Sequence, residues 1–127
     1  MLITIDFSAE TPIYTQLKDQ IITGIAGKAL APGEALPSVR RMAADIGVNV
    51  NTVGKAYTIL KDEGYITIDR RSGCFVSAEF PPADEQFFRG LREQLLPIAA
   101  AAACRSVGTE SFQSLCKKIY EELEVRS

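Results

Sequence analysis

Two amphipathic segments joined at Gly47 constrain this chain more than any other feature of its sequence. Apolar residues recur at helical spacing from Val39 to Ile46, and again between Asn49 and Gly64. Glycine tolerates the positive φ that a tight turn between two helices needs. The pattern therefore predicts a helix-turn-helix, a motif whose second helix enters the major groove of DNA.

A β-hairpin is predicted directly after this motif. Residues 65–69 and 74–77 alternate as two paired strands should, and the turn between them reads Arg70-Arg71-Ser72-Gly73. A hairpin with arginines at its tip, placed after a helix-turn-helix, is typical of a wing. We expect the two arginines to enter the neighbouring minor groove, where narrow A·T-rich stretches concentrate negative potential.

The residues before the motif predict further elements of the same domain. Residues 2–7 alternate at period two, which predicts a short strand or an extended arm. Thr11 as a cap followed by Pro12 is typical of a helix start, and the helical spacing of apolar residues continues to about Ala29. Leu36-Pro37 is expected to be extended, because a residue before proline avoids the helical region.

Pro81-Pro82 interrupts the chain after the hairpin and is the predicted domain boundary. We expect a winged helix-turn-helix domain over residues 1–78 and a helical tail over residues 83–125. Within the tail, Pro97 is expected to kink or divide the first helix, and Thr109 to cap the second. The expected fold class is thus mainly α with a small β-hairpin.

The tail has more apolar surface than two helices can hide against each other. Its apolar stripes consist of Phe87, Phe88, Leu91, Leu95 and Ile98 on the first helix and Phe112, Leu115, Ile119 and Leu123 on the second. We expect these residues to form a homodimer interface. The alternative is that the tail packs back onto the winged helix of the same chain.

The absence of histidine narrows the chemistry available to the chain. Without histidine, the Ser-His and Cys-His nucleophile arrangements and the commonest general base are missing. Cys74, Cys104 and Cys116 stand far apart without a CxxC pair, so we expect structural thiols and no metal site. The sequence predicts no enzyme activity and no cofactor.

Hydropathy and charge indicate a protein of the cytoplasm with a local basic surface. The longest small-apolar run, residues 98–104, is far too short to span a bilayer, and residues 1–7 lack the basic start of a signal peptide. We expect a cytoplasmic protein with no membrane partner. The net charge of −2 does not by itself favour binding to nucleic acid. The basic residues within residues 1–77, however, are concentrated in the predicted DNA-facing elements.

A series of short motifs is distributed along the chain in a characteristic order and spacing. They are Ile3-Thr-Ile-Asp, Pro12-Ile-Tyr-Thr-Gln-Leu, Pro32-Gly33, Leu36-Pro-Ser-Val-Arg40, Val48-Asn-Val-Asn-Thr-Val53, Ala56-Tyr57, Leu60, Glu63-Gly64 and Gly73-Cys-Phe-Val76. Together they resemble the GntR family of bacterial winged-helix regulators. The short tail of two helices resembles the YtrA-like branch, whereas other branches carry a much larger effector-binding domain.

The chain departs from the family pattern at three positions. Arg71 stands at the wing tip where glycine is common, Val50 stands where proline is frequent, and Gly54 replaces a longer polar residue. These departures leave the expected fold intact. They put the operator sequence in doubt, because Gly54 has no side chain with which to read a base edge.

The resemblance and the helix positions together define the candidate DNA-binding residues. These are Ser38, Arg40, Arg41, Asn49, Asn51, Thr52, Lys55, Arg70, Arg71, Ser72 and Gly73. The resemblance implies that Arg40 reaches the major groove or a nearby phosphate, and a guanidinium suits guanine O6 and N7. We expect Asn51 to contact DNA, Asn49 to act partly as a helix cap, and Lys55 to bind phosphate. Solvated surface charges are the alternative for the basic residues.

The leading functional hypothesis is a homodimeric, sequence-specific transcription regulator of the repressor type. Twofold symmetry predicts a pseudo-palindromic double-stranded operator with half-sites about one helical turn apart. The competing hypothesis is a winged-helix adaptor that binds protein and lacks sequence-specific DNA binding. No motif identifies a small-molecule effector, so an effector would have to act at the dimer interface or between the domains.

Overall fold

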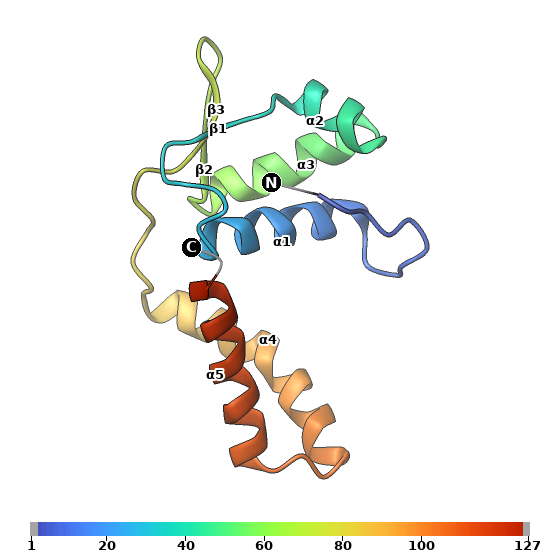
Figure 1. The fold of residues 1–127 in the computed structure, drawn as a ribbon, viewed down its shortest axis with the longest axis vertical. Coiled ribbons are helices and arrows are strands. Elements are labelled where there is room, and N and C mark those ends of the chain that lie inside the picture. Colours follow the sequence, from blue (N-terminus) through green and yellow to red (C-terminus); the bar gives the residue numbers. More distant parts are fainter. Residues whose placement is uncertain (1–2, 126–127) are drawn as a thin grey trace. The chain divides into compact units, whose positions relative to one another are not determined.

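The computed structural model describes residues 3–125, which form five helices and a small three-stranded sheet (Figure 1). In chain order the elements are α1 (Ile13–Ala26), β1 (Ala35–Leu36), α2 (Val39–Ile46), α3 (Val50–Asp62), β2 (Ile66–Asp69), β3 (Gly73–Val76), α4 (Glu85–Cys104) and α5 (Thr109–Val125). The expected fold class, a mainly helical winged helix-turn-helix followed by a two-helix tail, is confirmed. The chain divides after Phe80 into two compact units.

Helix α3 is the centre of the first unit, because α1, α2 and β2 all contact it. It buries Val53, Ala56, Tyr57 and Leu60, the same four residues that the helical spacing assigns to its inner face. Leu17 and Ile21 of α1 are also fully buried. Each buried Val, Leu or Ile side chain contributes roughly 1.5–3 kcal/mol by leaving water. The core thus fixes α3 while leaving its opposite side free.

The turn between α2 and α3 has the geometry that its residues predict. Ser38 caps α2, with its hydroxyl oxygen accepting the N–H of Arg41 at 3.1 Å. Gly47 ends α2 at φ +72°, a left-handed conformation that side chains rarely adopt. Asn49 caps α3, with its Oδ1 accepting the N–H of Asn51 at 2.7 Å. These caps set where the two helices begin.

The sheet has the strand order β1-β3-β2, and both strand pairs are antiparallel. In the hairpin Ile66 lies opposite Val76, and Leu36 of β1 lies opposite Cys74. The hairpin was predicted, whereas the sequence indicated only an extended segment at β1. A two-residue strand carries too little alternation to be recognised before its partner is known.

Of the two forms predicted for the N-terminal segment, a short strand or an extended arm, the structure has the arm, which is held by glutamine side chains of α1. Gln20 exchanges two hydrogen bonds with the backbone of Thr4, at 2.9 and 2.6 Å. Gln16 does the same with Asp6, at 2.9 and 3.0 Å. Each amide group offers a donor and an acceptor and so replaces a neighbouring strand. Residue 2 of the predicted strand lies outside the described residues.

Helix α1 differs from expectation at both ends. The cap position is occupied by Pro12, whose side chain makes no capping hydrogen bond, so the prediction that Thr11 caps the helix was wrong. The helix ends at Ala26, and Lys28 then adopts φ +61°. The N–H of Leu30 bonds to the carbonyl of Gly24, which turns the chain and buries Leu30 instead of extending the helix.

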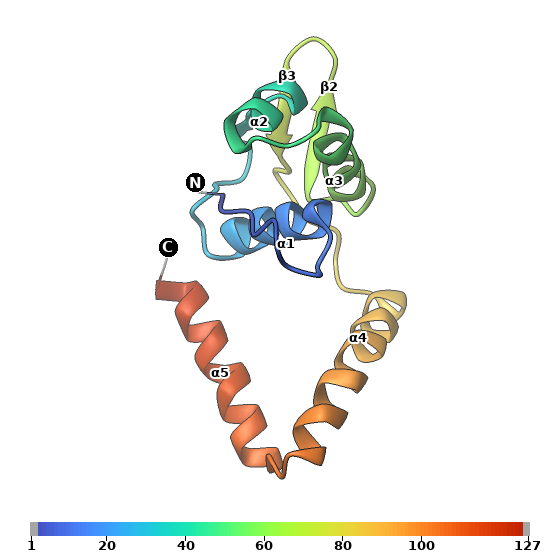
Figure 2. The same cartoon turned by 90° about the vertical axis from the view of Figure 1, so that its right-hand side faces the viewer.

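The second unit consists of α4 and α5, which diverge from the turn that joins them (Figure 2). Pro97 was predicted to kink or divide the first tail helix; helix α4 continues through this residue, so a division does not occur. Because the helix is exposed there, water can serve the Glu93 carbonyl that Pro97 leaves without a donor. Asp84 caps α4 by accepting the N–H of Phe87 at 2.8 Å.

The start of α5 also differs by one residue from expectation. The carbonyl of Gly108 accepts the N–H of Phe112 at 3.0 Å, so Gly108 occupies the cap position and Thr109 is the first helical residue. Thr109 was predicted as the cap because glycine is only modestly favoured at that position. Helix boundaries commonly shift by a residue in this way.

Candidate DNA-binding surface

The three candidate residues of α2 lie at its first turn and differ in how free their side chains are. Arg40 is exposed and forms no ion pair with any residue between 3 and 125. The Nε of Arg41 lies 3.4 Å from Oδ2 of Asp45, one helical turn away. An exposed pair of this kind is worth at most about 1 kcal/mol, so a phosphate can displace the carboxylate. Ser38 is committed to capping but retains its hydroxyl proton as a donor.

At the start of α3, the polar groups that are free to bind another molecule are mostly on side chains and not on the backbone. The side chain of Asn51 is exposed and makes no hydrogen bond to the described chain. The N–H groups of Asn51 and Thr52 both bond to Asn49, at 2.7 and 3.1 Å. Both N–H groups are thus engaged within the turn, so the side chains and not these two backbone amides are available to DNA. Thr52 is half-buried and the Asn49 side chain is used in the cap, which leaves Asn51 as an exposed amide free to bind DNA.

Lys55 lies on the exposed side of α3 and contacts an aromatic ring of α1. Its Nζ is 4.0 Å from the centre of the Tyr14 ring. A cation over the face of an exposed aromatic ring gains about 0.5–1 kcal/mol, and the ammonium keeps its charge for a phosphate. Sequence reasoning did not include Tyr14 among the candidate DNA-binding residues. The contact joins two helices and has no local sequence signal.

The wing tip is organised by Asp69, which sequence reasoning missed. Its Oδ1 accepts the N–H of Arg71 at 2.8 Å. Hydrogen bonds from the Arg71 N–H and from the hydroxyl and N–H of Ser72 hold the pKa of Asp69 below its usual value. Gly73 completes the turn at φ +106°. An aspartate that bonds the backbone two residues ahead is a common turn former, so the signal was present in Asp69-Arg-Arg-Ser.

All four predicted tip residues are exposed, and the arginines form no ion pair in the described structure. Because Asp69 holds the backbone of Arg71 and Ser72, the two arginines project from an ordered turn. Their contact with the minor groove stays a prediction. Ser72 bonds to Asp69, which makes its hydroxyl less available to DNA than the two guanidinium groups.

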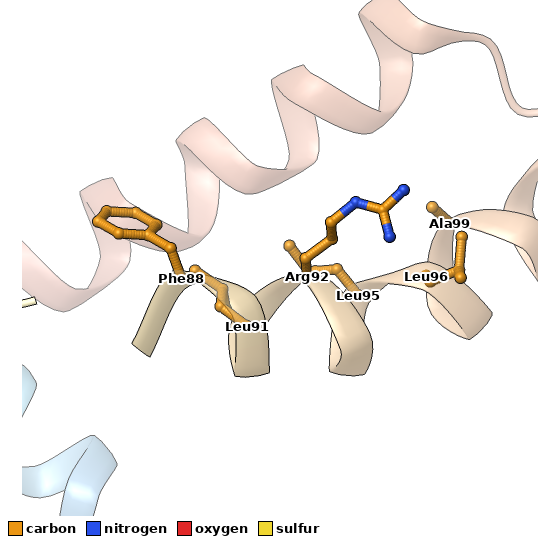
Figure 3. Close-up of a pocket in the computed structure, with 6 residues that line it drawn as sticks. All are labelled: Phe88, Leu91, Arg92, Leu95, Leu96 and Ala99. Carbon is orange, nitrogen blue, oxygen red and sulfur yellow. The ribbon is translucent and has the colours of Figure 1, made fainter. Parts of the chain in front are cut away.

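The predicted tail residues form an exposed apolar surface. None of the residues of α4 is buried, and Phe88 and Ile98 are 59% and 58% exposed. Five side chains and Ala99 border an open groove of about 360 Å³ along this helix (Figure 3): Phe88, Leu91, Arg92, Leu95, Leu96 and Ala99. On α5, Leu115 and Ile119 are exposed, whereas Phe112 and Leu123 are half-buried. Arg92 and Leu96 were absent from the predicted surface, although both follow Phe88 at helical spacing.

Cysteines, metal ligands and membrane-spanning helices were the remaining features considered in the sequence. Cys74 is buried, and burial raises the pKa of its thiol; Cys104 and Cys116 are exposed free thiols, so the expected structural role fits Cys74 alone. Among residues 3–125, no group of three potential ligands is placed to hold a metal ion. No helix in the same range is long and apolar enough to cross a membrane. Tyr57 is fully buried, as core packing predicts.

Several known proteins are similar to this chain. It is 33% identical to the HTH-type transcriptional repressor YtrA of Bacillus subtilis, over 97% of this chain and 95% of that protein. It is 37% identical to the HTH-type transcriptional regulator Rv1152 of Mycobacterium tuberculosis, over 70% of this chain and 73% of the relative.

Solved structures share the architecture. A transcriptional antiterminator from Listeria monocytogenes matches with a TM-score of 0.88 and 26% identity, covering 97% of this chain and 92% of the other. YtrA from Sulfolobus acidocaldarius, a GntR-family transcription factor, matches with a TM-score of 0.64 and 40% identity, covering 80% and 99%. Residues 13–76, which include all of the helix-turn-helix and the wing, match the model of the gntR family of bacterial regulatory proteins. The chain therefore belongs to the GntR family and is a DNA-binding transcriptional regulator.

Proposed function

We propose that this regulator is a homodimeric repressor that binds a pseudo-palindromic operator. The observation that carries the proposal is the apolar surface of α4, on which no residue is buried. A patch of this kind on a folded protein marks an interaction site. Similarity to a B. subtilis protein named as a repressor extends over nearly the whole chain, the tail included, and supports the repressor role.

A second copy of the chain is the natural cover for this surface. Phe88, Leu91, Leu95 and Leu96 border the groove of α4, and their counterparts in another copy match it in size and polarity. Pairing places two winged helices on one DNA molecule. Binding energies of two half-sites then add, and the symmetry of the protein imposes a palindrome on the operator.

Within each half-site, the exposed side chains divide into two roles. Arg40 and Asn51 have donors that suit base edges, guanine for the guanidinium and adenine for the amide. Lys55, held over Tyr14, supplies charge to a phosphate and so contributes affinity without sequence choice. Arg70 and Arg71 extend the contact into the adjacent minor groove.

Repression follows from occupancy: a dimer bound over a promoter excludes polymerase. Such a protein needs no catalytic group, and we propose none. Operator DNA lies in the cytoplasm of a prokaryotic cell, which is where the protein acts under this proposal.

The decisive experiment selects binding sites from a randomised pool of DNA duplexes with the full-length protein. The expected result is an enriched palindrome whose affinity falls steeply with salt, together with repression in a transcription assay that uses this operator. Binding that enriches no sequence would favour the adaptor hypothesis. Activation of transcription from the selected site would overturn the repressor role while leaving operator binding intact.

A further inference from the structure

The first turn of α3 carries an exposed apolar side chain on an otherwise polar surface. Val50 is the first residue of α3 and is 47% exposed, and its neighbours Asn49 and Asn51 are exposed polar residues. The buried residues of α3 begin only at Val53. The core therefore gives no reason for an apolar residue at position 50.

Gly54 lies one helical turn after Val50, on the same side of the helix. A Cβ built at Gly54 would meet no heavy atom within 4 Å, and its φ is not positive, so neither packing nor conformation requires a glycine. Glycine also weakens a helix interior. A glycine that the fold does not need leaves space for a molecule outside the chain to approach the helix beside Val50.

We propose that Val50 reads a thymine of the operator through its C5-methyl group, with the gap at Gly54 admitting the base edge. The inference rests on the proposed function, because it requires that α3 enters the major groove. The thymine methyl is the one apolar group that the four standard bases present in that groove. A valine side chain has no donor or acceptor, so against any other base edge it would displace water without replacing its hydrogen bonds.

Asn51, the neighbour of Val50, favours an A·T base pair as well. The exposed amide of Asn51 suits adenine, whose N6 and N7 offer a donor and an acceptor. We therefore expect each half-site of the operator to have adjacent A·T base pairs in contact with the first turn of α3.

The test replaces each thymine of the selected operator in turn by deoxyuridine, which removes only the C5-methyl group. Affinities of the full-length protein are measured by fluorescence anisotropy at one fixed salt concentration. Because burial of one methyl changes a binding constant about fourfold, one thymine per half-site should give about a fourfold rise in Kd when replaced. In Val50→Ser the same replacement should leave Kd unchanged.

Val107→Ser is the matched control. Val107 is a valine of similar exposure, with 42% of its surface accessible, and it lies in the turn between α4 and α5. It should keep the fourfold effect of deoxyuridine. Gly54→Gln is a second variant that fills the gap on α3, and it should abolish the methyl effect while keeping the salt dependence of binding. This variant decides the matter if Val50→Ser folds poorly by circular dichroism.

A fourfold loss that persists in Val50→Ser or in Gly54→Gln would overturn the inference, as would a wild-type protein that is indifferent to every deoxyuridine. Failure of the proposed function has a different signature. In that case the selection enriches no sequence at all, and the reading of thymine is rejected together with operator binding.

Discussion

The hydroxyl of Tyr57 donates a hydrogen bond of 2.8 Å to the carbonyl oxygen of Pro37. Tyr57 is fully buried on α3, and Pro37 directly precedes the cap of α2. The bond thus ties the helix that carries Asn51 and Lys55 to the start of the helix that carries Arg40. From inside the core, it fixes the spacing between the candidate DNA-binding side chains of α2 and those of α3.

Removing this hydroxyl should destabilise the first unit. Tyr57→Phe keeps the ring in the core but leaves the Pro37 carbonyl without its donor, which should cost about 1–2 kcal/mol of unfolding free energy. Urea unfolding measures the loss. Tyr65→Phe is the control, because Tyr65 is half-buried and its hydroxyl bonds to none of the described residues. Equal losses in both variants would show that the bond to Pro37 contributes nothing specific.

Alkaline pH should act through the same residue. Burial, with a smaller contribution from Cys74, raises the pKa of Tyr57 above its ordinary value. Since the folded-state pKa is the higher one, the stabilisation is fully present below the unfolded value of about 10 and declines as pH rises beyond it. Burial raises the pKa of Cys74 too, so its contribution declines from about pH 8.5. Tyr57→Phe should therefore flatten the fall in unfolding free energy above pH 10, which denaturant titrations at several pH values measure. An identical alkaline limb in both proteins would contradict the assignment.

The parts of the fold that the sequence predicts well are those set by local chemistry. Ser38, Gly47 and Asn49 define the ends of α2 and α3 through bonds and backbone conformations within a few residues. Other helix ends are predicted less well because neighbouring residues compete for the cap position. Gly108 occupies the cap position of α5 that Thr109 was expected to fill. Cap choice depends on the path of the preceding chain as well as on residue type.

Contacts between distant segments carry no periodic signal, and these account for most of what was missed. Lys55 meets Tyr14 across two helices, and β1 exists only because β3 lies beside it. The alternation of the N-terminal segment left a strand and an extended arm open, and the side chains of Gln16 and Gln20, from a different segment, hold it as an arm. The candidate DNA-binding residues could each be named from the sequence. Only the structure shows that Arg40 forms no ion pair within the described residues whereas Arg41 is paired with Asp45.

Substitutions on α2 and α3 should separate readers of bases from anchors on phosphate. Arg40→Ala and Asn51→Ala should each reduce the preference for the selected operator over scrambled DNA by about 1–3 kcal/mol. Lys55→Ala should weaken binding to both DNAs about equally and reduce the salt slope by about 1. Anisotropy titrations over a series of salt concentrations measure both quantities. Equal loss of preference in all three variants would contradict this division of roles.

The tail should control assembly without controlling the fold of the first unit. Leu95→Asp places a charge in the apolar groove of α4, where Leu95 is exposed, so the chain should fold but remain monomeric. Light scattering at a protein concentration of tens of micromolar measures the mass. At that concentration a dimer with a Kd of roughly 1 μM is mostly assembled. Glu110→Lys on α5, away from this groove, is the control. A wild-type protein that is already monomeric would reject the homodimer.

A chain cut after Phe80 should give the same monomeric state with much weaker operator binding. The cut belongs there and not after Val76, because Ser77 is buried and its N–H bonds to the carbonyl of Tyr65 at 3.0 Å. The ring of Phe80 also lies 6.2 Å from that of Tyr65. Circular dichroism should show cooperative unfolding of this fragment. Undiminished operator affinity would mean that one winged helix is sufficient.

The wing should contribute affinity that depends on the DNA beside each half-site. Arg70 and Arg71 are exposed on a turn that Asp69 holds in place, and narrow A·T-rich minor grooves attract arginine most strongly. The double substitution Arg70→Ala, Arg71→Ala should therefore weaken binding most on operators with A·T-rich flanks. Thermal stability should stay nearly unchanged, because neither side chain is part of the core. Titrations on A·T-flanked and G·C-flanked operators distinguish the outcomes: an identical loss on both would reduce the arginines to phosphate anchors, and no loss on either would mean that the tip is merely solvated.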